Sequence, residues 1–501
     1  MECIVDVEFN CKNNFILIGV RSKSGYRYFL DIKNFLDYIE DFKLVYCYNL
    51  EYDYSFFLRA LFRKGKVYLH YHSQGLSFID VYYKGKRQIW RDLAYHCNML
   101  PVKEIAKFFD MKKGKINYEK MSIKTLKTVI KYNKNDCEIE WKILQSLNKL
   151  YRKFKCNRAR ATVGSNAMEI YRNFFSDRIG YRIPQDVLKE WQKAYRGGYC
   201  DVFKKGKYTG KFYLIDVNSL YPFIMLNSYP LPSSYKKVEK IRPNEKFYII
   251  RTEQGYYSNY DVEYLFDNSK DLYYYVFTEE CYPFKRYINM MMKYKIDSEK
   301  KGKKFEKMIY KTLANSLYGK FGQQSRMELL TNEKNIKKYL KRPECNIEEI
   351  VEDIFKIWWI GKFPFWTNFV YSIFTTSRAR LFLYNAIETV KELGFEVYYC
   401  DTDSLLISGD ISKLKDWIDP YQIGKWKLVK RSKSINIIGK KLFTMGDMVK
   451  CKGVSGFKNK KEFILTGKTT YDKFIKIKEG LRRNIKAGRT VKVTKRNLVN
   501  L

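Results

Sequence analysis

Histidine is almost absent from this 501-residue chain, which contains 3, and its 11 cysteines are scattered singly without a Cys-x-x-Cys pair. A zinc site is therefore not expected, and unpaired cysteines favour a reducing, cytoplasmic environment. The sequence also lacks a run of about 18 apolar residues, the length that a membrane-spanning helix requires. Its first residues, Met1–Glu8, show no basic segment followed by an apolar one. A secreted or membrane protein is therefore not expected.

Acidic residues are few relative to basic ones. Lys plus Arg number 95 against 54 Asp plus Glu, which gives a formal net charge of +41 at pH 7. An excess of this size indicates a polyanionic partner, and with membrane binding disfavoured this partner is a nucleic acid. The 44 Tyr, 34 Phe and 8 Trp residues suit base stacking, but suit ordinary cores better. With 46% hydrophobic residues, the chain is long enough for several domains.

Two carboxylates stand between two apolar, β-prone runs in Tyr399-Cys-Asp-Thr-Asp-Ser404. This pattern predicts the tip of a β-hairpin. Because strand side chains repeat every two residues, Asp401 and Asp403 are expected on one side, roughly 6–7 Å apart. Such charges repel unless a cation neutralises them, and Mg²⁺ takes carboxylate oxygens while leaving positions for phosphate and water. A polar turn without any ion is an equal alternative.

Four acidic residues near the amino terminus belong to separate predicted elements. They are Asp6, Glu8, Asp53 and Asp136. The first two share one face of a strand-like run, the third follows a second strand and lies four residues after Asn49, and the fourth shares a helix face with Tyr132. Two metal ions about 4 Å apart on such carboxylates activate water against a phosphodiester. Each acid by itself is more often a surface residue.

The order of these residues resembles the three proofreading motifs of DEDDy-type 3′→5′ exonucleases. The resemblance implies that the four acids hold two metal ions, that Tyr132 orients the attacking water and that Asn49 contacts DNA. Lys113, in a Lys-Lys-Gly-Lys cluster, stands where related polymerases have a lysine that contacts the scissile phosphate. A solvated lysine is the alternative.

A strand-like run also ends in an aspartate at Lys211-Phe-Tyr-Leu-Ile-Asp216, and a turn follows in Val-Asn-Ser-Leu-Tyr221-Pro222. Strand ends are positions at which a carboxylate reaches a ligand without being buried. Upstream, Tyr195-Arg-Gly-Gly-Tyr199 forms a basic connector whose glycines allow the backbone to approach a phosphate closely. A plain turn is the alternative for this segment.

The segment Phe305–Gly319 shows a helical pattern, for which Gly319 is the predicted C-cap. At about 100° per residue, Lys311, Asn315 and Tyr318 fall within roughly 60° of one another. A lysine meets a triphosphate as a point charge, a tyrosine offers a ring for stacking, and an asparagine is a neutral hydrogen-bonding group. An amphipathic core helix with a solvated lysine is the alternative.

Three segments resemble motifs A, B and C of family B DNA polymerases, in this order: the run around Asp216, the helical segment Phe305–Gly319 and the hairpin Tyr399–Ser404. The connector resembles the Tyr-x-Gly-Gly motif of the same enzymes. The chain most resembles the protein-primed polymerases of small podophages. The resemblance implies an α/β multidomain fold, in which a ribonuclease H-like 3′-5′ exonuclease domain precedes a right-hand polymerase with palm, fingers and small thumb. It implies metal ligands at Asp216, the Val217 backbone and Asp403, with Asp401 close by.

Further residues follow from the same resemblance. Nucleotide-binding residues are Tyr221 beneath the sugar, Lys311, Asn315, Tyr318 and Lys307, with Lys295 as a weaker candidate. DNA-binding residues are Asn49, Tyr195, Gly197, Gly198, Ser219, Thr402 and Lys441. Lys441 belongs to Lys441-Leu-Phe443, which resembles a primer-binding Lys-x-Tyr motif with phenylalanine in place of tyrosine. The implied cofactors are two Mg²⁺ ions per active site, for which Mn²⁺ can substitute.

The implied partners are a DNA primer–template, deoxynucleoside triphosphates and a priming (terminal) protein, for a monomer in the host cytoplasm if the chain is viral. The expected division of the chain is an exonuclease domain (1–155), a connector (156–200), palm with motif A and a reduced first insertion (201–284), fingers (285–322), a second insertion (323–364), palm with motif C (365–453) and a small thumb (454–501). No fold is predicted between Leu231 and Phe277, and a frayed basic tail is the alternative for the last dozen residues.

The interval between motifs A and B looks too short for the full insertion that contacts a priming protein in the resembled enzymes. A conventionally primed family B polymerase is therefore the nearest alternative. Two other classes are a basic nucleic-acid-binding protein without catalysis and a stand-alone nuclease.

Overall fold

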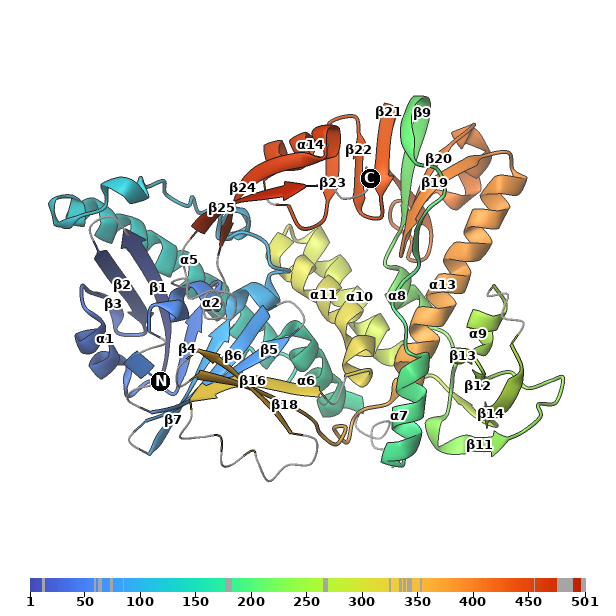
Figure 1. The fold of residues 1–501 in the computed structure, drawn as a ribbon, viewed down its shortest axis with the longest axis horizontal. Coiled ribbons are helices and arrows are strands. Elements are labelled where there is room, and N and C mark those ends of the chain that lie inside the picture. Colours follow the sequence, from blue (N-terminus) through green and yellow to red (C-terminus); the bar gives the residue numbers. More distant parts are fainter. Residues whose placement is uncertain are drawn as a thin grey trace.

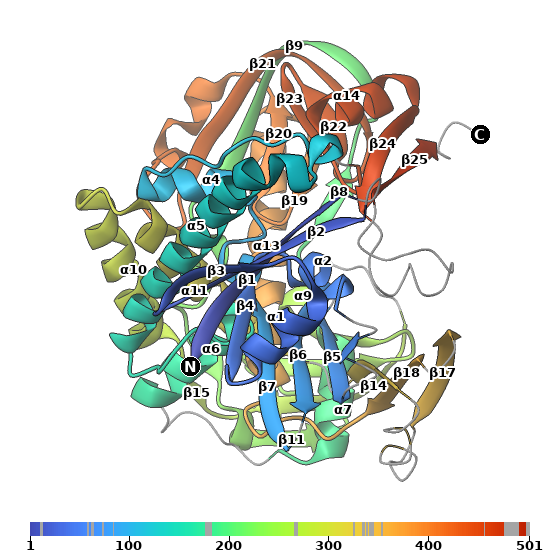
Figure 2. The ribbon, with the colours of Figure 1, turned by 90° about the vertical axis from the view of Figure 1, so that its left-hand side faces the viewer.

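The computed structural model describes the chain except for residues 11–13, 58–59, 62–64, 73–74, 84, 176–182, 265–268, 324–325, 333–335, 337–338, 340–344, 352–353, 455, 475–489 and 497–501. Its largest sheet has 10 strands in the order β17-β18-β16-β5-β6-β7-β4-β1-β2-β3 (Figures 1 and 2). The strands from the amino-terminal part are β1 (Glu2–Asn10), β2 (Phe15–Ser22), β3 (Gly25–Phe29), β4 (Leu44–Cys47), β5 (Lys66–His72), β6 (Gly75–Tyr83) and β7 (Lys86–Asp92). β4 pairs in parallel with β1 and β7.

Helices cover this sheet and bring acidic residues to it. They are α1 (Ile32–Ile39), α2 (Leu50–Ser55), α4 (Val102–Ala106) and the long α5 (Leu126–Arg152). Helix α5 contacts β1 and β2. Its approach is so close that a Cβ on Gly19 of β2 would lie 1.8 Å from Asn133 Oδ1 of α5. A glycine at this position therefore sets the distance between the helix and the sheet.

The segment between motifs B and C extends the same sheet. Its strands are β16 (Arg326–Asn332), β17 (Asn346–Val351) and β18 (Ile354–Ile360). β16 pairs antiparallel with β5, with Leu329 opposite His70 and Leu330 opposite Leu69. The charged, helix-like run within this insertion lies outside the described residues for the most part. A segment more than 250 residues away in sequence thus continues the amino-terminal sheet.

A second sheet, of 7 strands, corresponds to the predicted palm and has the order β23-β22-β21-β9-β20-β19-β8. Its strands are β8 (Cys200–Val202), β9 (Gly206–Val217), β19 (Glu396–Asp401), β20 (Ser404–Ser408), β21 (Trp426–Gly439), β22 (Leu442–Met445) and β23 (Met448–Cys451). Helix α13 (Phe369–Glu392) packs on β19, and α8 (Leu220–Ile224) follows β9 directly. The predicted hairpin is present, but β19 ends at Asp401, so Asp403 lies in the turn rather than on a strand. The strand-period argument for its side chain is therefore wrong, because the chain has already left the pleat.

Two helices, α10 (Lys285–Lys300) and α11 (Lys304–Phe321), pack against each other and, in Figure 1, lie between the amino-terminal sheet and the palm. The predicted end of α11 at Gly319 is wrong, because the helix continues to Phe321 and Gly322 is its C-cap. A Cβ on Gly322 would lie 2.7 Å from Tyr195 and from Ser372 Oγ, whereas one on Gly319 would meet nothing within 4 Å. The glycine that close packing requires is the later one.

Smaller units complete the fold. Between motifs A and B, where no fold was predicted, β11 (Tyr235–Val238), β12 (Tyr248–Thr252), β13 (Tyr256–Ser258) and β14 (Asp271–Phe277) form a sheet in the order β11-β14-β12-β13, and α9 (Asn259–Val262) follows β13. The short strands β10 (Tyr229–Pro230) and β15 (Glu280–Cys281) pair beside it. Helices α6 (Val163–Phe175) and α7 (Gln185–Ala194) precede the palm.

The carboxy-terminal unit contains α14 (Phe457–Thr466), β24 (Lys468–Phe474) and β25 (Thr490–Arg496). β24 and β25 pair antiparallel along their length, so residues 490–496 form a strand rather than a frayed tail. The basic pair Arg482-Arg483 lies outside the described residues. Among the described residues, none of the helices combines the length and apolar character needed to span a bilayer.

Candidate active sites

The first carboxylate cluster lies where α5 crosses β1. Asp6 and Glu8 of β1 and Asp136 of α5 offer oxygens that all lie within 4.8 Å of one another. Asp53 of α2 lies beside them, and its Oδ1 accepts a hydrogen bond of 3.0 Å from the backbone N–H of Val7, between the two acids of β1. The structure therefore brings together all four predicted acids.

Burial makes this cluster electrostatically costly in the absence of a cation. Burial, together with the smaller effect of the neighbouring Asp136 charge, raises the pKa of Asp6 to about 7. Burial also raises the pKa of Glu8, Asp53 and Asp136, although the Lys113 ammonium opposes the shift at Asp136. Hard carboxylate oxygens that repel one another in a buried site fit a divalent cation such as Mg²⁺ or Mn²⁺.

Lys113 and Tyr132 lie at this cluster. Lys113 Nζ is 2.6 Å from Asp136 Oδ2 and 5.5 Å from the centre of the Tyr132 ring. The Tyr132 hydroxyl lies 3.4 Å from that of Tyr118. Asn49 is the N-cap residue of α2, and its backbone N–H donates to Asp92 Oδ1 at 3.0 Å.

Sequence reasoning missed Asn133, the residue next to Tyr132. Its Nδ2 donates to Asp6 Oδ2 at 2.8 Å and to the Asp6 carbonyl at 3.2 Å, while its Oδ1 accepts from the Tyr26 hydroxyl. Asn133 thus fixes one carboxylate of the cluster to α5. An uncharged amide on the buried face of an otherwise amphipathic helix was the available signal.

The second carboxylate cluster lies at the edge of the palm sheet. Pairing of β9 with β20 sets Asp216 opposite Ser404, and Ser404 in turn pairs with Asp401 across the hairpin. The backbone N–H of Val217 donates to the carbonyl of Asp403 at 2.7 Å. Burial, together with the smaller effects of the Asp216 and Asp401 charges, raises the pKa of Asp403 to about 6. Carboxylates whose charges act on one another in this way suit divalent cations.

The glycine connector lies directly on the hairpin turn. The backbone N–H of Thr402 donates to the Tyr199 carbonyl at 2.6 Å. A Cβ on Gly198 would lie 2.6 Å from Thr402 Oγ1, whereas one on Gly197 would meet nothing within 4 Å. Thr402 has a φ of 60°, and Ser219, at the start of α8, has a φ of 55°. The two turns that carry the carboxylates are therefore both locally strained.

A buried arginine that sequence reasoning also missed binds the backbone of the connector. Arg380 of α13 donates from Nη1 to the carbonyls of Arg196 at 3.0 Å and Gly197 at 2.7 Å. Its Nη2 is 2.6 Å from Asp261 Oδ1 of α9, and both side chains are at most 5% exposed. A charged residue on the buried face of the predicted helix was the signal that could have revealed it.

Two lysines contact the palm carboxylates. Lys441, which was predicted, has its Nζ 3.1 Å from Asp401 Oδ1. Lys427, which was not, has its Nζ 2.6 Å from Asp216 Oδ1. The ring of Phe443 packs 5.0 Å from that of Tyr399, and the Tyr399 hydroxyl accepts a hydrogen bond of 3.2 Å from the Lys441 backbone N–H. A tyrosine hydroxyl thus lies beside Lys441 although residue 443 lacks one.

The predicted nucleotide-binding residues of α11 have different surroundings. The Tyr318 ring lies 4.7 Å from that of Tyr221 of α8. Burial lowers the pKa of Lys295 and the Lys311 charge lowers it further, so these two ammonium groups lie near each other.

Two other residues of α11 make contacts within the helix pair. Asn315 Nδ2 donates to the Lys311 carbonyl at 2.7 Å, within α11 itself. The Lys307 side chain forms an ion pair with Glu299 of α10.

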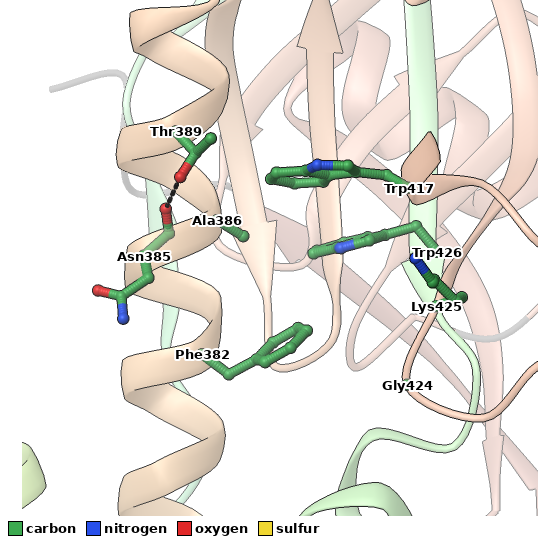
Figure 3. A pocket seen from close by; sticks show the side chains of 8 residues that line it. All are labelled: Phe382, Asn385, Ala386, Thr389, Trp417, Gly424, Lys425 and Trp426. Atoms are coloured by element: carbon green, nitrogen blue, oxygen red, sulfur yellow. Dashed lines mark hydrogen bonds between the residues drawn. The ribbon is translucent and has the colours of Figure 1, made fainter. Parts of the chain in front are cut away.

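A cavity of about 370 Å³ lies behind motif A, between α13 and the loop before β21 (Figure 3). Trp426 is stacked between Trp417 and Phe382, with ring centres 6.1 Å apart in each pair. The loop wall is joined to motif A, because Gly424 N–H donates to the Asn218 carbonyl at 2.9 Å and Asn218 N–H donates to the Lys425 carbonyl at 2.8 Å. This aromatic stack anchors the start of β21.

Comparison with known proteins identifies the class. The fold is that of a family B DNA polymerase, with an exonuclease domain followed by palm, fingers and thumb, as predicted. The sequence model of the family described as DNA polymerase type B, organellar and viral, matches residues 96–260 and 251–357, more than half of the chain. The chain therefore belongs to the organellar and viral type B DNA polymerases.

The DNA-directed DNA polymerase of Enterobacteria phage PRD1 is 26% identical over 373 residues, which are 66% of this chain and 63% of that protein. The match thus spans less than two thirds of that relative. The structure of Phi29 DNA polymerase complexed with primer-template DNA and incoming nucleotide substrates has a TM-score of 0.76 at 21% identity, over 99% of this chain and 98% of that one. The Phi29 enzyme complexed with single-stranded DNA gives the same TM-score and covers 99% and 100%. These structures share the fold.

Proposed function

We propose that this protein is a DNA-directed DNA polymerase with a 3′→5′ proofreading exonuclease. The observation that carries the proposal is the grouping of Asp216, Asp401 and Asp403 at the palm edge, beside the connector. A second, separate carboxylate cluster supports the editing activity. DNA primer–template and deoxynucleoside triphosphates are the proposed substrates, in line with the family and with the ligands of the Phi29 complex.

At the palm, Asp216, Asp403 and the Val217 backbone would hold divalent ions, with Asp401 beside them. Two Mg²⁺ ions are proposed, with Mn²⁺ able to substitute, and when bound they supply Lewis-acid stabilisation of the transferred phosphate and of the primer 3′-oxygen. Lys311 and Lys295 would neutralise the triphosphate as point charges.

The sugar and the DNA would be held by neighbouring groups. Tyr221, packed against Tyr318, would lie beneath the deoxyribose and exclude a ribose 2′-hydroxyl. The connector (Tyr195, Gly197, Gly198), Ser219, Thr402 and Lys441 would hold the primer–template. Their support is the direct contact of Gly198 with Thr402 and of Lys441 with Asp401. Lys307 is a weaker candidate for the triphosphate, because Glu299 pairs with it.

At the amino-terminal cluster, Asp6, Glu8, Asp53 and Asp136 would hold the ions of the exonuclease. Tyr132 would orient the attacking water through its hydroxyl, and Lys113 would contact the scissile phosphate. The position of Lys113, 2.6 Å from Asp136 Oδ2, supports this role because the phosphate must approach the same carboxylate. Asn49 would contact the DNA end.

The test uses one change at each cluster. Asp403→Ala is expected to abolish primer extension and to leave 3′ trimming, while Asp6→Ala with Glu8→Ala is expected to do the opposite. Both activities are measured on one labelled primer–template, with and without nucleotides. Asp410→Ala, an exposed acid just after β20, is the matched control. Loss of both activities from either folded variant would contradict two independent sites, and metal-independent binding alone would indicate a DNA-binding protein without catalysis.

We propose further that synthesis starts from a protein primer. One support is the amino-acid sequence of the motifs, which resembles that of protein-primed polymerases. The other is the separate sheet β11–β14 between motifs A and B, because this sheet provides additional surface beside α7 and α13. The purified protein is incubated with labelled dATP, Mg²⁺ and extract from infected cells. A labelled protein band is expected. Normal extension of a DNA primer without such a band would favour conventional priming.

The domain boundaries predicted above, a monomeric state and a location in the host cytoplasm complete the proposal. The joining of segment 326–360 to the amino-terminal sheet supports a second insertion that acts together with the exonuclease domain. Size-exclusion chromatography with light scattering tests the monomer.

A further inference from the structure

Lys427 lies opposite Asp216 because of the register of the palm sheet. Strand β21 pairs with β9 so that these two residues are direct partners. Lys427 Nζ is 2.6 Å from Asp216 Oδ1, and the side chains are 35% and 26% exposed. The pair therefore lies at the open edge of the site, where an incoming ligand can reach it. Since the backbone register fixes the contact, it does not depend on a flexible loop.

The palm cluster thus carries two internal cations. Lys427 pairs with Asp216, and Lys441 pairs with Asp401. For the third carboxylate, Asp403, none of the ion pairs found among the described residues provides a partner, although the Lys427 charge opposes the rise of its pKa. An ammonium group on Asp216 and a divalent cation on the same oxygen exclude each other by charge and by space.

We propose that Lys427 is a positioning residue that competes with a divalent cation for Asp216 and transfers its charge to the triphosphate when nucleotide and metal enter together. This inference rests on the proposed polymerase function. Its effect would be to disfavour loading of the palm with metal alone.

The surroundings of Lys427 support the second half of the inference. Burial lowers the pKa of Lys295 of α10, and the charges of Lys311 and Lys427 lower it further, so Lys427 lies within electrostatic range of the lysines proposed to hold the triphosphate. An ammonium displaced from Asp216 would therefore find the triphosphate as its nearest anion. Lys430, on the same strand, instead contacts Asp447.

The test measures metal and nucleotide binding separately. In the full chain with Asp6→Ala and Glu8→Ala, which removes two of the four acids of the amino-terminal cluster, Mn²⁺ binding is measured by electron paramagnetic resonance without nucleotide. Lys427→Met is expected to tighten it about 5- to 10-fold, because one adjacent positive charge is lost. Binding of a nucleotide to a complex with dideoxy-terminated primer is expected to weaken by a similar factor.

Two variants serve as controls. Lys427→Arg keeps the charge and is expected to bind Mn²⁺ and nucleotide with the wild-type dissociation constants. Lys430→Met is expected to change neither dissociation constant. Unchanged Mn²⁺ binding in Lys427→Met overturns the inference, as does a loss of both bindings, which would indicate a structural role. The proposed function is judged separately, and it fails if the wild-type chain extends no primer. Normal extension by the wild-type chain, together with unaltered Mn²⁺ binding in Lys427→Met, rejects only the role of Lys427.

Discussion

At the scale of single residues, the buried acids of the amino-terminal cluster determine how the protein responds to pH. Burial raises the pKa of Asp6 to about 7 from an ordinary value of 3.8. Between these values the folded state binds more protons than the unfolded state, so this group makes the metal-free protein less stable as pH rises. His96, whose pKa burial lowers to about 4, acts in the opposite direction.

We therefore predict that Asp6→Asn stabilises the metal-free protein by an amount that depends on pH. In EDTA, its Tm relative to the wild-type Tm is expected to increase by a few degrees between pH 5 and pH 7.5, because the cost of ionising Asp6 is removed only where Asp6 would be ionised. Comparison with wild type cancels the contribution of His96. A difference in Tm that does not depend on pH would contradict the shifted pKa of Asp6.

A second residue-scale prediction concerns the hydroxyl beside Lys441. Tyr399→Phe removes the acceptor of the Lys441 backbone N–H and is expected to weaken primer-end binding a few-fold. Phe443→Tyr places a hydroxyl at a fully buried position and is expected to cost about 1–3 kcal/mol of stability unless it finds a partner. Primer-binding titrations and thermal melts measure the two effects. Tighter primer binding by Phe443→Tyr would show that the hydroxyl belongs at residue 443.

At the scale of elements, the connector and the hairpin form one unit. Gly198→Ala places a Cβ against Thr402, so it is expected to push the connector away from the turn and to lower primer–template affinity roughly 10-fold. In Gly197→Ala the added Cβ has no neighbour within 4 Å, so this variant is expected to lose much less primer–template affinity. Thr402→Gly in the Gly198→Ala background removes the clashing side chain and should raise the affinity again to that of Thr402→Gly alone. Electrophoretic mobility shifts measure all three, and equal losses from both alanine variants would contradict this contact.

The buried pair of Arg380 and Asp261 links three elements: α13, α9 and the connector. Arg380→Met leaves Asp261 buried and uncompensated, which is expected to cost about 3–5 kcal/mol. Adding Asp261→Asn removes the orphaned charge and should recover part of this loss. Denaturant unfolding of both variants measures the difference. Additive losses in the double variant would show that the pair does not act as a unit.

At the scale of the whole molecule, a segment that follows motif B completes the sheet of the amino-terminal domain. The pairing of β16 with β5 places Leu330 opposite Leu69. Cysteines at these two positions are expected to form a disulfide, since facing residues of antiparallel strands have suitable Cβ separations. Peptide mapping under non-reducing conditions detects the link. Cysteines at 68 and 330, which are out of register, are the control and should not cross-link.

The short motifs and their chemistry were determined by the sequence alone. Local periodicity explains the spacing of the recognised groups. These are the carboxylates at strand ends, the lysine, asparagine and tyrosine on one helix face, and the glycine pair. The helix that contains Tyr132 and Asp136 and the strand that carries Asp216 near its end were predictable because hydrophobic periodicity specifies them locally. Alternation failed at Asp403, where the chain leaves the strand.

Which distant groups meet depends on how the elements pack against one another. The contact of Lys427 with Asp216 depends on the register between strands that are more than 200 residues apart. Arg380 acquires its role from carbonyls of the connector, and Asn133 acquires its role from the crossing of α5 over β1. The attachment of β16 to β5 likewise has no local signature, because an edge strand can pair with any free edge. Local patterns specify which elements form and what chemistry they carry, whereas register and packing across the chain determine which of their side chains make a site.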